Sequence, residues 1–314
     1  MRKVFIDGQE GTTGLKIRER LNGRTDFELI EIDAAKRKDE SARRDCLESA
    51  DIAILCLPDD AARRTVELVR GKSTRLIDSS TAHRVASGWI YGLPELGTSQ
   101  RIAIRNARFI ANPGCHATAF ILGLYPLVKA GIVGKDYPVF TQSLTGYSGG
   151  GKKLIAKYED SSQPKIFDSR PYALSLTHKH VPEMMQVVGL EYPPGLLPVV
   201  GPFYNGMIVS TLLESRALAQ PPTARQIHEV LTAYYHDERF IRVVPFESEA
   251  FLEAGYLSAI GCNDTNRADI FVFGHDSQVL VAVRLDNLGK GASGAAVQNL
   301  NLMLGASEGQ GLVA

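Results

Sequence analysis

The sequence predicts an α/β protein of two domains: a doubly wound parallel sheet in the N-terminal domain and an α+β arrangement in the C-terminal domain. Short apolar runs alternate with helical stretches from the start of the chain, which is typical of βαβ units. Beyond about Pro126 the strands become longer and alternate between apolar and polar residues. The chain has 314 residues, 44% of them hydrophobic, which is more than one small domain usually holds.

The N-terminal domain is expected to span residues 1–114. Its strands are expected at VFIDG, FELIEID, DIAILCLP and RLIDSS, and its helices at about residues 13–21, 40–49 and 60–70. Strands and helices that alternate in this way build a parallel sheet, so this domain is predicted to be of the Rossmann type.

The C-terminal domain is expected to span residues 115–286. Its strands include PVFTQSLTG and LLPVVGPFYNGMIVSTLLE, while ADIFVFG and VLVAVRLDN predict an antiparallel hairpin with HDS as its turn. A helix from Thr223 to about Asp237 has apolar residues on one face and is expected to cover this sheet. The remaining residues, 287–314, include GASGAAVQNLNLMLG, whose small residues and good helix formers predict a close-packing helix.

Charge and composition argue for a small-molecule partner. Lys plus Arg and Asp plus Glu both total 35, so the formal net charge is zero. A chain without net positive charge creates no long-range field that would attract nucleic acid or an anionic membrane. The first residues show no long apolar run, and no stretch approaches the roughly 20 apolar residues of a membrane span, so a cytoplasmic protein is expected. The 4 cysteines are widely scattered and lack paired C-x-x-C spacing, which indicates free thiols.

A glycine-rich turn follows the first predicted strand. Its sequence is Gly8-Gln9-Glu10-Gly11-Thr12-Thr13-Gly14, a G-x-x-G-x-x-G pattern leading into a helix. Glycines permit close backbone approach, and a helix N-terminus presents N–H groups to a pyrophosphate, so this turn predicts dinucleotide binding. The alternative is an ordinary glycine-rich turn between a strand and a helix.

The choice between NAD and NADP depends on the end of the second predicted strand. Asp33 is expected to end that strand, where an acid usually binds the ribose 2′-hydroxyl of NAD. Lys36, Arg37 and Lys38 follow and suit the 2′-phosphate of NADP. A solvated basic loop explains this triplet equally well, so the residues alone leave the cofactor open.

Cys115 is the candidate nucleophile. It follows the short strand FIA and the turn NPG, and it begins a helix that runs to about Gly131. The positive end of the helix macrodipole favours the thiolate, which is the reactive form of a cysteine. The alternative is a small buried hydrophobic residue. Cys46, Cys56 and Cys262 are expected to be structural.

Two histidines in the segment THKHVPE are candidates for the acid/base group. Imidazole exchanges protons near neutral pH, and Pro182 is expected to open a helix directly after them. If the segment is extended, His178 and His180 point to opposite sides, so only one of them is expected to face Cys115. A zinc pair lacks a third ligand in the sequence, so no metal site is predicted, and surface loop histidines are the remaining alternative.

Two segments are candidates for binding an anion. Ser148 and Gly149 lie in TGYSGGGKK, where consecutive glycines expose backbone N–H groups and two lysines add positive charge. A mobile linker is an equally good interpretation of this segment. Arg84, which follows DSSTAH, is the second candidate, with the same alternative of a structural role.

As an ordered set, these segments resemble the N-acetyl-gamma-glutamyl-phosphate reductase family, particularly its shorter form, over nearly the whole chain. The motifs that carry the resemblance are GQEGTTG, AILCLPDDAAR, DSSTAHR, NPGCHAT, SLTGYSGGGKK, HKHVPEM and DNLGKGASGAAVQN. The histidine after the cysteine in NPGCHAT, where longer members carry tyrosine, indicates the short form. The resemblance implies a fold like that of aspartate-semialdehyde and glyceraldehyde-phosphate dehydrogenases, with a C-terminal helix that returns to the NADP-binding domain.

The resemblance also implies the site residues and the reaction. Cys115 matches the family's nucleophile, a histidine of HKHVPE matches its acid/base group, for which His180 is preferred, and Asn287 matches an asparagine near the nicotinamide carboxamide. The reaction that the resemblance implies is NADPH-dependent reduction of N-acetyl-γ-glutamyl phosphate to N-acetylglutamate 5-semialdehyde in arginine biosynthesis, through a Cys115 thioester and with release of inorganic phosphate. A homotetramer or homodimer is expected. Binding to nucleic acid or to a membrane is not expected.

Three other functions are consistent with the residues themselves. The same chemistry on another acyl phosphate, such as an aspartyl or aminoadipyl derivative, would differ only in the substrate pocket. A nucleotide-binding regulatory protein would bind the cofactor without a selectively reactive cysteine. A cysteine hydrolase would use Cys115 and His180 but would leave the glycine-rich turn unexplained.

Overall fold

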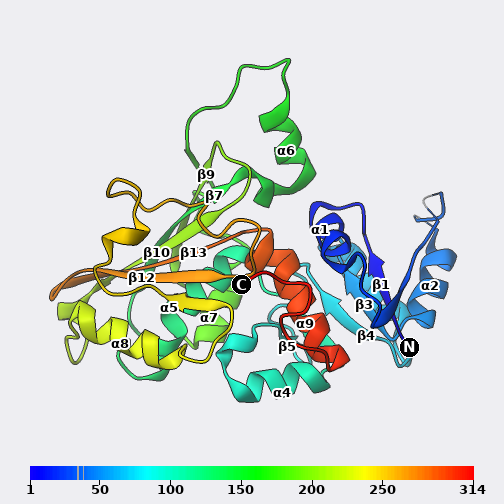
Figure 1. Ribbon diagram of the computed structural model, residues 1–314, viewed down its shortest axis with the longest axis horizontal. Coiled ribbons are helices and arrows are strands. Elements are labelled where there is room, and N and C mark those ends of the chain that lie inside the picture. Colours follow the sequence, from blue (N-terminus) through cyan, green and yellow to red (C-terminus); the bar gives the residue numbers. More distant parts are fainter. Residues whose placement is uncertain (34, 38) are drawn as a thin grey trace. The chain divides into compact units, whose positions relative to one another are not determined.

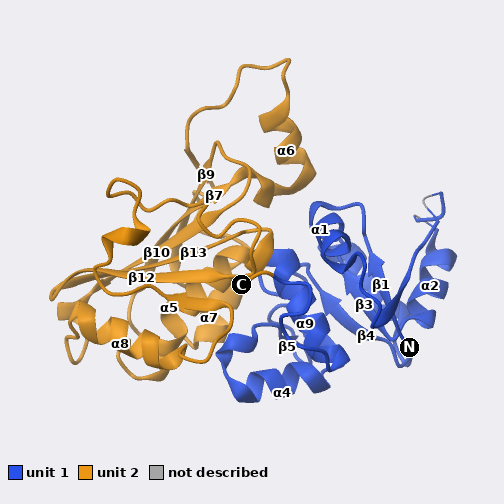
Figure 2. Cartoon of the chain, viewed as in Figure 1, with its two compact units in different colours: residues 1–114, 292–312 blue, residues 115–291, 313–314 orange. Residues whose placement is uncertain are grey.

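The computed structural model describes residues 1–33, 35–37 and 39–314. The chain forms two compact units, which Figure 2 distinguishes by colour. The first unit comprises Met1–Gly114 and Ala292–Leu312, and the second comprises Cys115–Gly291 and Val313–Ala314. The C-terminal helix therefore belongs to the first unit, while residues 287–291 belong to the second.

The first unit contains a parallel sheet of 6 strands in the order β2-β1-β3-β4-β6-β5 (Figure 1). Its strands are β1 (Arg2–Asp7), β2 (Phe27–Ile30), β3 (Ile52–Leu55), β4 (Arg75–Asp78), β5 (Ile90–Tyr91) and β6 (Phe109–Ala111). Its helices are α1 (Thr12–Leu21), α2 (Glu40–Ser49), α3 (Asp59–Leu68), α4 (Thr98–Asn106) and α9 (Gly294–Leu304). The strand order reverses between β1 and β3, which is where ligands bind in open α/β sheets, and the predicted Rossmann-type sheet is confirmed.

The apolar strands explain why this sheet is buried. All four residues of β3 are buried, as are the last four of β1, because a parallel sheet with helical crossovers is covered on both faces. Phe5, Leu47, Leu55 and Leu76 form a core cluster with no exposed surface between the sheet and its helices. Continuous apolar runs in the sequence therefore become central strands.

The second strand is shorter than expected. It ends at Ile30, so the prediction that Asp33 ends this strand is wrong. Asp33 is exposed, and its carboxylate accepts a hydrogen bond of 2.8 Å from the backbone N–H of Ala35. An aspartate that binds its own backbone two residues on favours a turn over a strand. Lys38 of the predicted basic triplet lies outside the described residues.

The helix α9 contacts α1, α4 and β4 of the first unit. Its buried face includes polar side chains, and the amide of Asn299 donates hydrogen bonds to the carbonyl of Gly92 at 2.9 Å and to Asn112 Oδ1 at 3.1 Å. A Cβ atom at Gly92 would lie 2.4 Å from Asn299 Nδ2, so only glycine permits this approach. A π-helical turn, Gly289–Ser293, precedes the helix.

The second unit contains a mixed sheet of 7 strands in the order β11-β12-β13-β10-β7-β9-β8. Its strands are β7 (Phe140–Gly146), β8 (Arg170–Pro171), β9 (Gly195–Gly201), β10 (Met207–Glu214), β11 (Ile241–Val243), β12 (Ala268–His275) and β13 (Gln278–Leu285). Its helices are α5 (Cys115–Lys129), α6 (Gly151–Glu159), α7 (Val181–Val188) and α8 (Ala224–Tyr234). The expected α+β arrangement is confirmed, as is the antiparallel β12–β13 hairpin.

Helix α5 is held against this sheet along most of its length. It contacts β10, β12 and β13, and 12 of its 15 residues are buried. A Cβ atom at Gly123 would lie 3.1 Å from Val283, so the helix approaches the sheet closely at that point. The hydroxyl of Tyr235 donates to the carbonyl of Leu122 at 2.8 Å and ties α5 to the end of α8. The N-terminus of α5 is therefore held in place by a packed core.

Among the described helices, none combines the length and the apolar character that crossing a membrane requires.

Candidate active site

Cys115 is the first residue of α5 and is half-buried. The backbone of Gly291 packs directly against it, since a Cβ atom there would lie 2.7 Å from the Cβ of Cys115. Any larger residue at position 291 would push the cysteine away from its place. The predicted candidate nucleophile therefore lies at a helix N-terminus, where the macrodipole favours an anion, and its backbone has little room to move.

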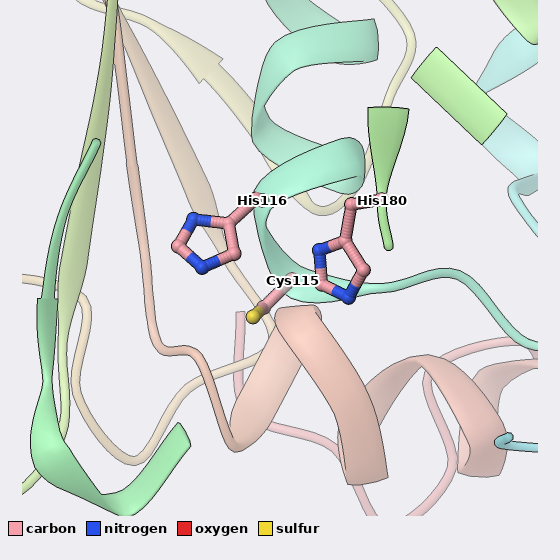
Figure 3. Close-up of side chains that lie close together, drawn as sticks. All are labelled: Cys115, His116 and His180. Carbon is pink, nitrogen blue, oxygen red and sulfur yellow. The ribbon is translucent and has the colours of Figure 1, made fainter. Parts of the chain in front are cut away.

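His180 lies beside Cys115. It is the N-cap residue of α7, which Pro182 helps to begin, and its side chain is buried. One ligand-type atom each from Cys115, His116 and His180 lies within 4.8 Å of the other two. In Figure 3 the two imidazole rings flank the sulfur of Cys115. The structure thus brings together the two residues predicted to be catalytic, and it adds His116.

His116 is anchored at both ring nitrogens. Its Nδ1 lies 2.7 Å from Ser143 Oγ on β7, and its Nε2 lies 3.0 Å from the hydroxyl of Tyr172. Burial lowers the pKa of His116 from 6.5 to about 3, and the neighbouring His178 and Lys179 lower it further. His116 is therefore a neutral imidazole near pH 7, held in one orientation by two hydroxyl groups.

His178 does not point away from the site, so the prediction that the two histidines face opposite sides is wrong. The segment turns at His180, whose backbone has φ −86° and ψ −13°, instead of being extended. The His180 N–H donates to His178 Nδ1 at 3.2 Å, and the two rings meet edge-on at 4.8 Å between centroids. The His178 ring also lies 5.1 Å from that of His116. A helical turn brings both histidines together where a strand would separate them.

Tyr172 completes the wall of this cluster. Burial raises the pKa of Tyr172 well above its usual range, and the negative charge of the Cys115 thiolate raises it further. The phenol therefore keeps its proton and takes part only in hydrogen bonding. Its ring is tilted against His116 with 6.5 Å between centroids, and it lies 5.9 Å from His178.

Ser148, Gly149 and Asn287 lie together in the second unit. Ser148 and Gly149 belong to a 3₁₀ helix, Tyr147–Gly150, directly after β7. Asn287 Nδ2 donates to Ser148 Oγ at 2.9 Å, and Asn287 Oδ1 accepts from the backbone N–H of Gly206 at 2.8 Å. A Cβ atom at Gly149 would lie 3.5 Å from Asn287 Nδ2. Asn287 therefore connects two loops, and the predicted phosphate and nicotinamide roles of these residues stay predictions.

Arg84 lies in the first unit and is half-buried. Its guanidinium donates to the carbonyls of Asn112 and Ser79, each at 3.2 Å. Nearby, His83 Nδ1 lies 2.6 Å from the carboxylate of Asp78 at the end of β4. These contacts fix the loop after β4, and the phosphate-binding role of Arg84 also stays a prediction.

The glycine-rich turn has the geometry that a phosphate cradle requires. Gly8 has φ +87°, and a Cβ atom there would lie 2.4 Å from the carbonyl oxygen of Cys56. A Cβ atom at Gly14 would lie 2.5 Å from the carbonyl oxygen of Gly8. Gly11 is the N-cap of α1, and no side chain caps the first turn, to which Thr12 and Thr13 belong. Because glycine has no side chain that could cap the helix, the backbone N–H groups of this first turn are suited to bind an anion.

Basic residues follow the neighbouring strand β2. Arg37 forms an ion pair with Glu10 of the glycine-rich turn, with 3.8 Å between Nη1 and Oε2, and both side chains are about half exposed. The segment predicted to select between NAD and NADP thus lies beside the turn predicted to hold the pyrophosphate. The carboxylate of Asp33 accepts a hydrogen bond from the backbone N–H of Ala35.

The other three cysteines have environments that keep the thiol protonated. Burial raises the pKa of Cys56 to about 12 and that of Cys262 to about 11. Cys262 also donates to the carboxylate of Asp269 at 3.2 Å. Burial raises the pKa of Cys46 as well. None of these three thiols is suited to act as a nucleophile near neutral pH.

Sequence reasoning missed three members of the cluster. Ser143, Tyr172 and the buried anchoring of His116 were not predicted, because they depend on strands β7 and β8 meeting the start of α5 and the loop before α7. His116 was noted only as a mark of the short form. Its position directly after Cys115 was the available signal, since neighbours in a first helical turn share the same helix end.

Known proteins resemble this chain along its whole length. The family described as "Semialdehyde dehydrogenase, NAD binding domain" matches residues 3–104, and "Semialdehyde dehydrogenase, dimerisation domain" matches residues 115–287. The chain is 48% identical to N-acetyl-gamma-glutamyl-phosphate reductase 2 of Nostoc sp. over 99% of both chains. It is 48% identical to the N-acetyl-gamma-glutamyl-phosphate reductase of Sinorhizobium medicae over 97% of this chain and 99% of that one.

Solved structures show the same fold at low sequence identity. Aspartate semialdehyde dehydrogenase II from Vibrio cholerae aligns with a TM-score of 0.72 and 17% identity, covering 97% of this chain and 98% of that one. The enzyme from Francisella tularensis aligns with a TM-score of 0.73 and 15% identity, covering 96% and 100%. The close relatives and the matched domains agree with the fold: the chain belongs to the N-acetyl-gamma-glutamyl-phosphate reductase family, among the semialdehyde dehydrogenases.

Proposed function

We propose that this protein reduces N-acetyl-γ-glutamyl phosphate to N-acetylglutamate 5-semialdehyde with NADPH, releasing inorganic phosphate in arginine biosynthesis. The observation that carries the proposal is the cluster of Cys115, His116 and His180 at the start of α5, in a chain 48% identical to reductases of that name. A half-buried thiol beside an imidazole is the arrangement that covalent acyl transfer requires.

In the first step the Cys115 thiolate attacks the acyl carbon of the substrate. A carbon–sulfur bond forms, and the bond from carbon to the phosphate oxygen breaks. Phosphate departs with its bonding electrons and takes up one proton from solvent. The product is a thioester, which accepts hydride more readily than a carboxylate does, so covalent capture divides one difficult reduction into two easier steps.

NADPH held at the glycine-rich turn would supply the hydride for reduction of the thioester, which becomes a thiohemiacetal on Cys115. His180 donates a proton to the oxygen of this intermediate and recovers it when the carbon–sulfur bond breaks. That collapse releases the aldehyde and restores the thiolate. His116, neutral and anchored to Ser143 and Tyr172, holds the local arrangement without exchanging protons.

The first unit fits an NADP cofactor. Glycines at positions 8, 11 and 14 leave the start of α1 open to a pyrophosphate, since side chains there would meet backbone atoms or cover the helix N-terminus. Lys36 and Arg37 supply positive charge for the 2′-phosphate, and the turn at Asp33 removes the strand-end carboxylate that would favour NAD. We assign these residues, with Thr12 and Thr13, to cofactor binding.

The remaining predicted residues are assigned to binding the phosphate and the nicotinamide. Arg84 supplies a guanidinium that suits a phosphoryl group, and Ser148 and Gly149 supply a hydroxyl and a backbone N–H. Asn287 positions Ser148 and keeps a second amide hydrogen for the nicotinamide carboxamide.

We further propose a homo-oligomer, either a dimer or a tetramer, that works in the cytoplasm. The match of residues 115–287 to a dimerisation domain supports an oligomer. Analytical ultracentrifugation of the purified protein gives the number of chains directly.

A reverse-direction assay tests the function. NADPH formation is followed by absorbance with NADP, phosphate and N-acetylglutamate semialdehyde, with aspartate semialdehyde in a parallel reaction. Fast, phosphate-dependent NADPH formation with the acetylated aldehyde alone is expected. Preferential use of aspartate semialdehyde would move the substrate to another acyl phosphate, and no turnover with either would contradict a reductase.

A further inference from the structure

The cluster at the start of α5 contains the donor atoms of a metal site. A thiol and two imidazoles, from Cys115, His116 and His180, each place one ligand-type atom within 4.8 Å of the others. They come from two segments, the first turn of α5 and the N-cap of α7, both in the second unit. A thiolate with two imidazoles is a donor set that zinc sites use, while magnesium and calcium prefer oxygen ligands.

The distances are close to those that one ion needs. Zinc bonds of about 2.3 Å to sulfur and about 2.0–2.1 Å to nitrogen place tetrahedral ligand atoms roughly 3.5 Å apart. The observed limit of 4.8 Å therefore requires each pair of atoms to close by up to about 1.3 Å. Figure 3 shows the His180 ring beside the Cys115 sulfur, and changes in the side-chain torsions of these two residues would bring their ligand atoms closer together.

One of the imidazoles already has the support that metal ligands need. Metal-binding histidines usually direct their second ring nitrogen to a hydrogen-bonding group that fixes the ring. His116 Nδ1 lies 2.7 Å from Ser143 Oγ, so Ser143 fixes the ring and leaves Nε2 as the ligand atom. The hydroxyl of Tyr172, 3.0 Å from Nε2, would give up this contact and lie beside the ion.

We infer that Cys115, His116 and His180 form a reversible site for one thiophilic divalent cation, with Zn²⁺ as the physiological member of that class. On binding, the Cys115 thiol loses its proton to solvent, a metal–sulfur bond forms, and two neutral imidazoles complete three ligand positions. The fourth position is left for water. No electron transfer takes place, so a chelator restores the free thiol.

The site has a regulatory consequence. A cation held by Cys115 removes the sulfur from attack on the acyl carbon, so zinc and the acyl phosphate exclude each other. This inhibition rests on the proposed function, whereas the binding itself does not require Cys115 to be a nucleophile. The third ligand is contributed by His116, the residue that the short form carries directly after its cysteine.

The test uses the full-length protein, freed of metal by a chelator, and Co²⁺ as a spectroscopic probe. Binding of one Co²⁺ per chain is expected to produce a sulfur-to-cobalt charge-transfer band with the visible bands of a tetrahedral ion. The charge-transfer band should vanish in Cys115→Ser, and Cys46→Ser, the matched cysteine control, should keep it. Ser143→Ala should weaken binding by about 10–100-fold through loss of the ring's support.

A second measurement needs no variant. Equimolar Zn²⁺ should protect Cys115 from alkylation by iodoacetamide, as read by peptide mass spectrometry, and a chelator should restore alkylation. Absence of the charge-transfer band, its persistence in Cys115→Ser, or unprotected alkylation would overturn the inference. A band and zinc protection in a protein without reductase activity would support the metal site and contradict only the proposed function.

Discussion

Helices α1 and α5 each follow a parallel strand after a short turn, and their N-termini present different chemical groups. Helix α1 begins after the glycine-rich turn, where no side chain caps its first turn. Helix α5 begins with Cys115, with the rings of His116 and His180 beside it. Both helix starts carry partial positive charge, but the first presents backbone N–H groups, which we assign to the cofactor, and the second presents Cys115, which we propose as the nucleophile.

On the proposed function, the same element of structure serves cofactor binding at α1 and covalent catalysis at α5. At α1 the absence of side chains is what matters, since Cβ atoms at Gly8 and Gly14 would lie 2.4 and 2.5 Å from backbone oxygens. At α5 the side chains are what matter, and His116 is held by Ser143 on β7 and by Tyr172, which follows β8. Substitutions at the two helix starts should therefore affect different quantities.

The largest expected effect is at the reactive helix start. Cys115→Ser should lower kcat by at least about a thousandfold, because a hydroxyl is a far weaker nucleophile than a thiolate. NADPH affinity, measured by fluorescence titration, should stay nearly unchanged because the glycine-rich turn and the basic residues assigned to the cofactor belong to the first unit. Cys46→Ser is the control and should keep full activity. Substantial turnover by Cys115→Ser would remove the cysteine from the mechanism.

The two histidines beside Cys115 should differ in their effect. His180→Asn removes the proposed proton donor and should lower kcat by about 10²–10⁴-fold, with a changed pH profile. His178→Asn keeps a polar group near the hydrogen bond to the His180 backbone and should have a smaller effect, without moving the pH profile. Steady-state rates between pH 5.5 and about 9 distinguish the two. A larger loss in His178→Asn would exchange their roles.

The binding helix start should respond through stability and affinity. Gly8→Ala introduces a Cβ at φ +87°, 2.4 Å from a carbonyl oxygen, and should lower the free energy of unfolding by about 1–3 kcal/mol. Gly11→Ala has ordinary contacts of 3.4 Å or more and should change stability by less than about 0.5 kcal/mol. It should still raise the KM for NADPH by about tenfold, because its methyl group covers the helix start. Urea unfolding and steady-state kinetics measure these effects, and equal stability losses would contradict the assigned geometry.

The last expected effect concerns the pH dependence of stability. Burial lowers the pKa of His116 from 6.5 to about 3, so between these values the unfolded chain binds a proton that the folded chain excludes. The free energy of unfolding therefore keeps its full value above pH 6.5. It falls by up to about 1.4 kcal/mol per pH unit as the pH decreases toward 3. His116→Asn lacks this contribution, so its free energy of unfolding should fall less steeply between pH 6.5 and 4.5. Parallel slopes for the two proteins would show that His116 titrates normally.

The binding helix start was predictable from the sequence because its signal is local. Gly8, Gly11 and Gly14 lie within one turn between a strand and a helix, and the alternating pattern placed that turn at the first strand. Cys115 was predictable as a helix start for the same reason. The boundary at Asp33 was not, because its apolar neighbour Ile32 continues the strand pattern while the aspartate side chain binds the Ala35 backbone.

The surroundings of Cys115 depend on contacts between distant segments. Ser143, Tyr172 and His116 meet only because β7 and the segment after β8 lie against the start of α5. The mutual position of His178 and His180 depends on a helical turn that the spacing of two residues does not reveal. Sequence patterns therefore indicated the candidate residues, and the tertiary structure alone indicated what holds them in place.

The central claim, that Cys115 carries the acyl group, has a direct test by mass spectrometry. The protein is incubated with NADP and N-acetylglutamate semialdehyde without phosphate, so that oxidation forms the thioester but nothing releases it. An acyl group is expected on Cys115 alone, formed with one equivalent of NADPH and lost when phosphate is added. Formation of NADPH with Cys115 unmodified, or an acyl group on Cys46, Cys56 or Cys262, would contradict it.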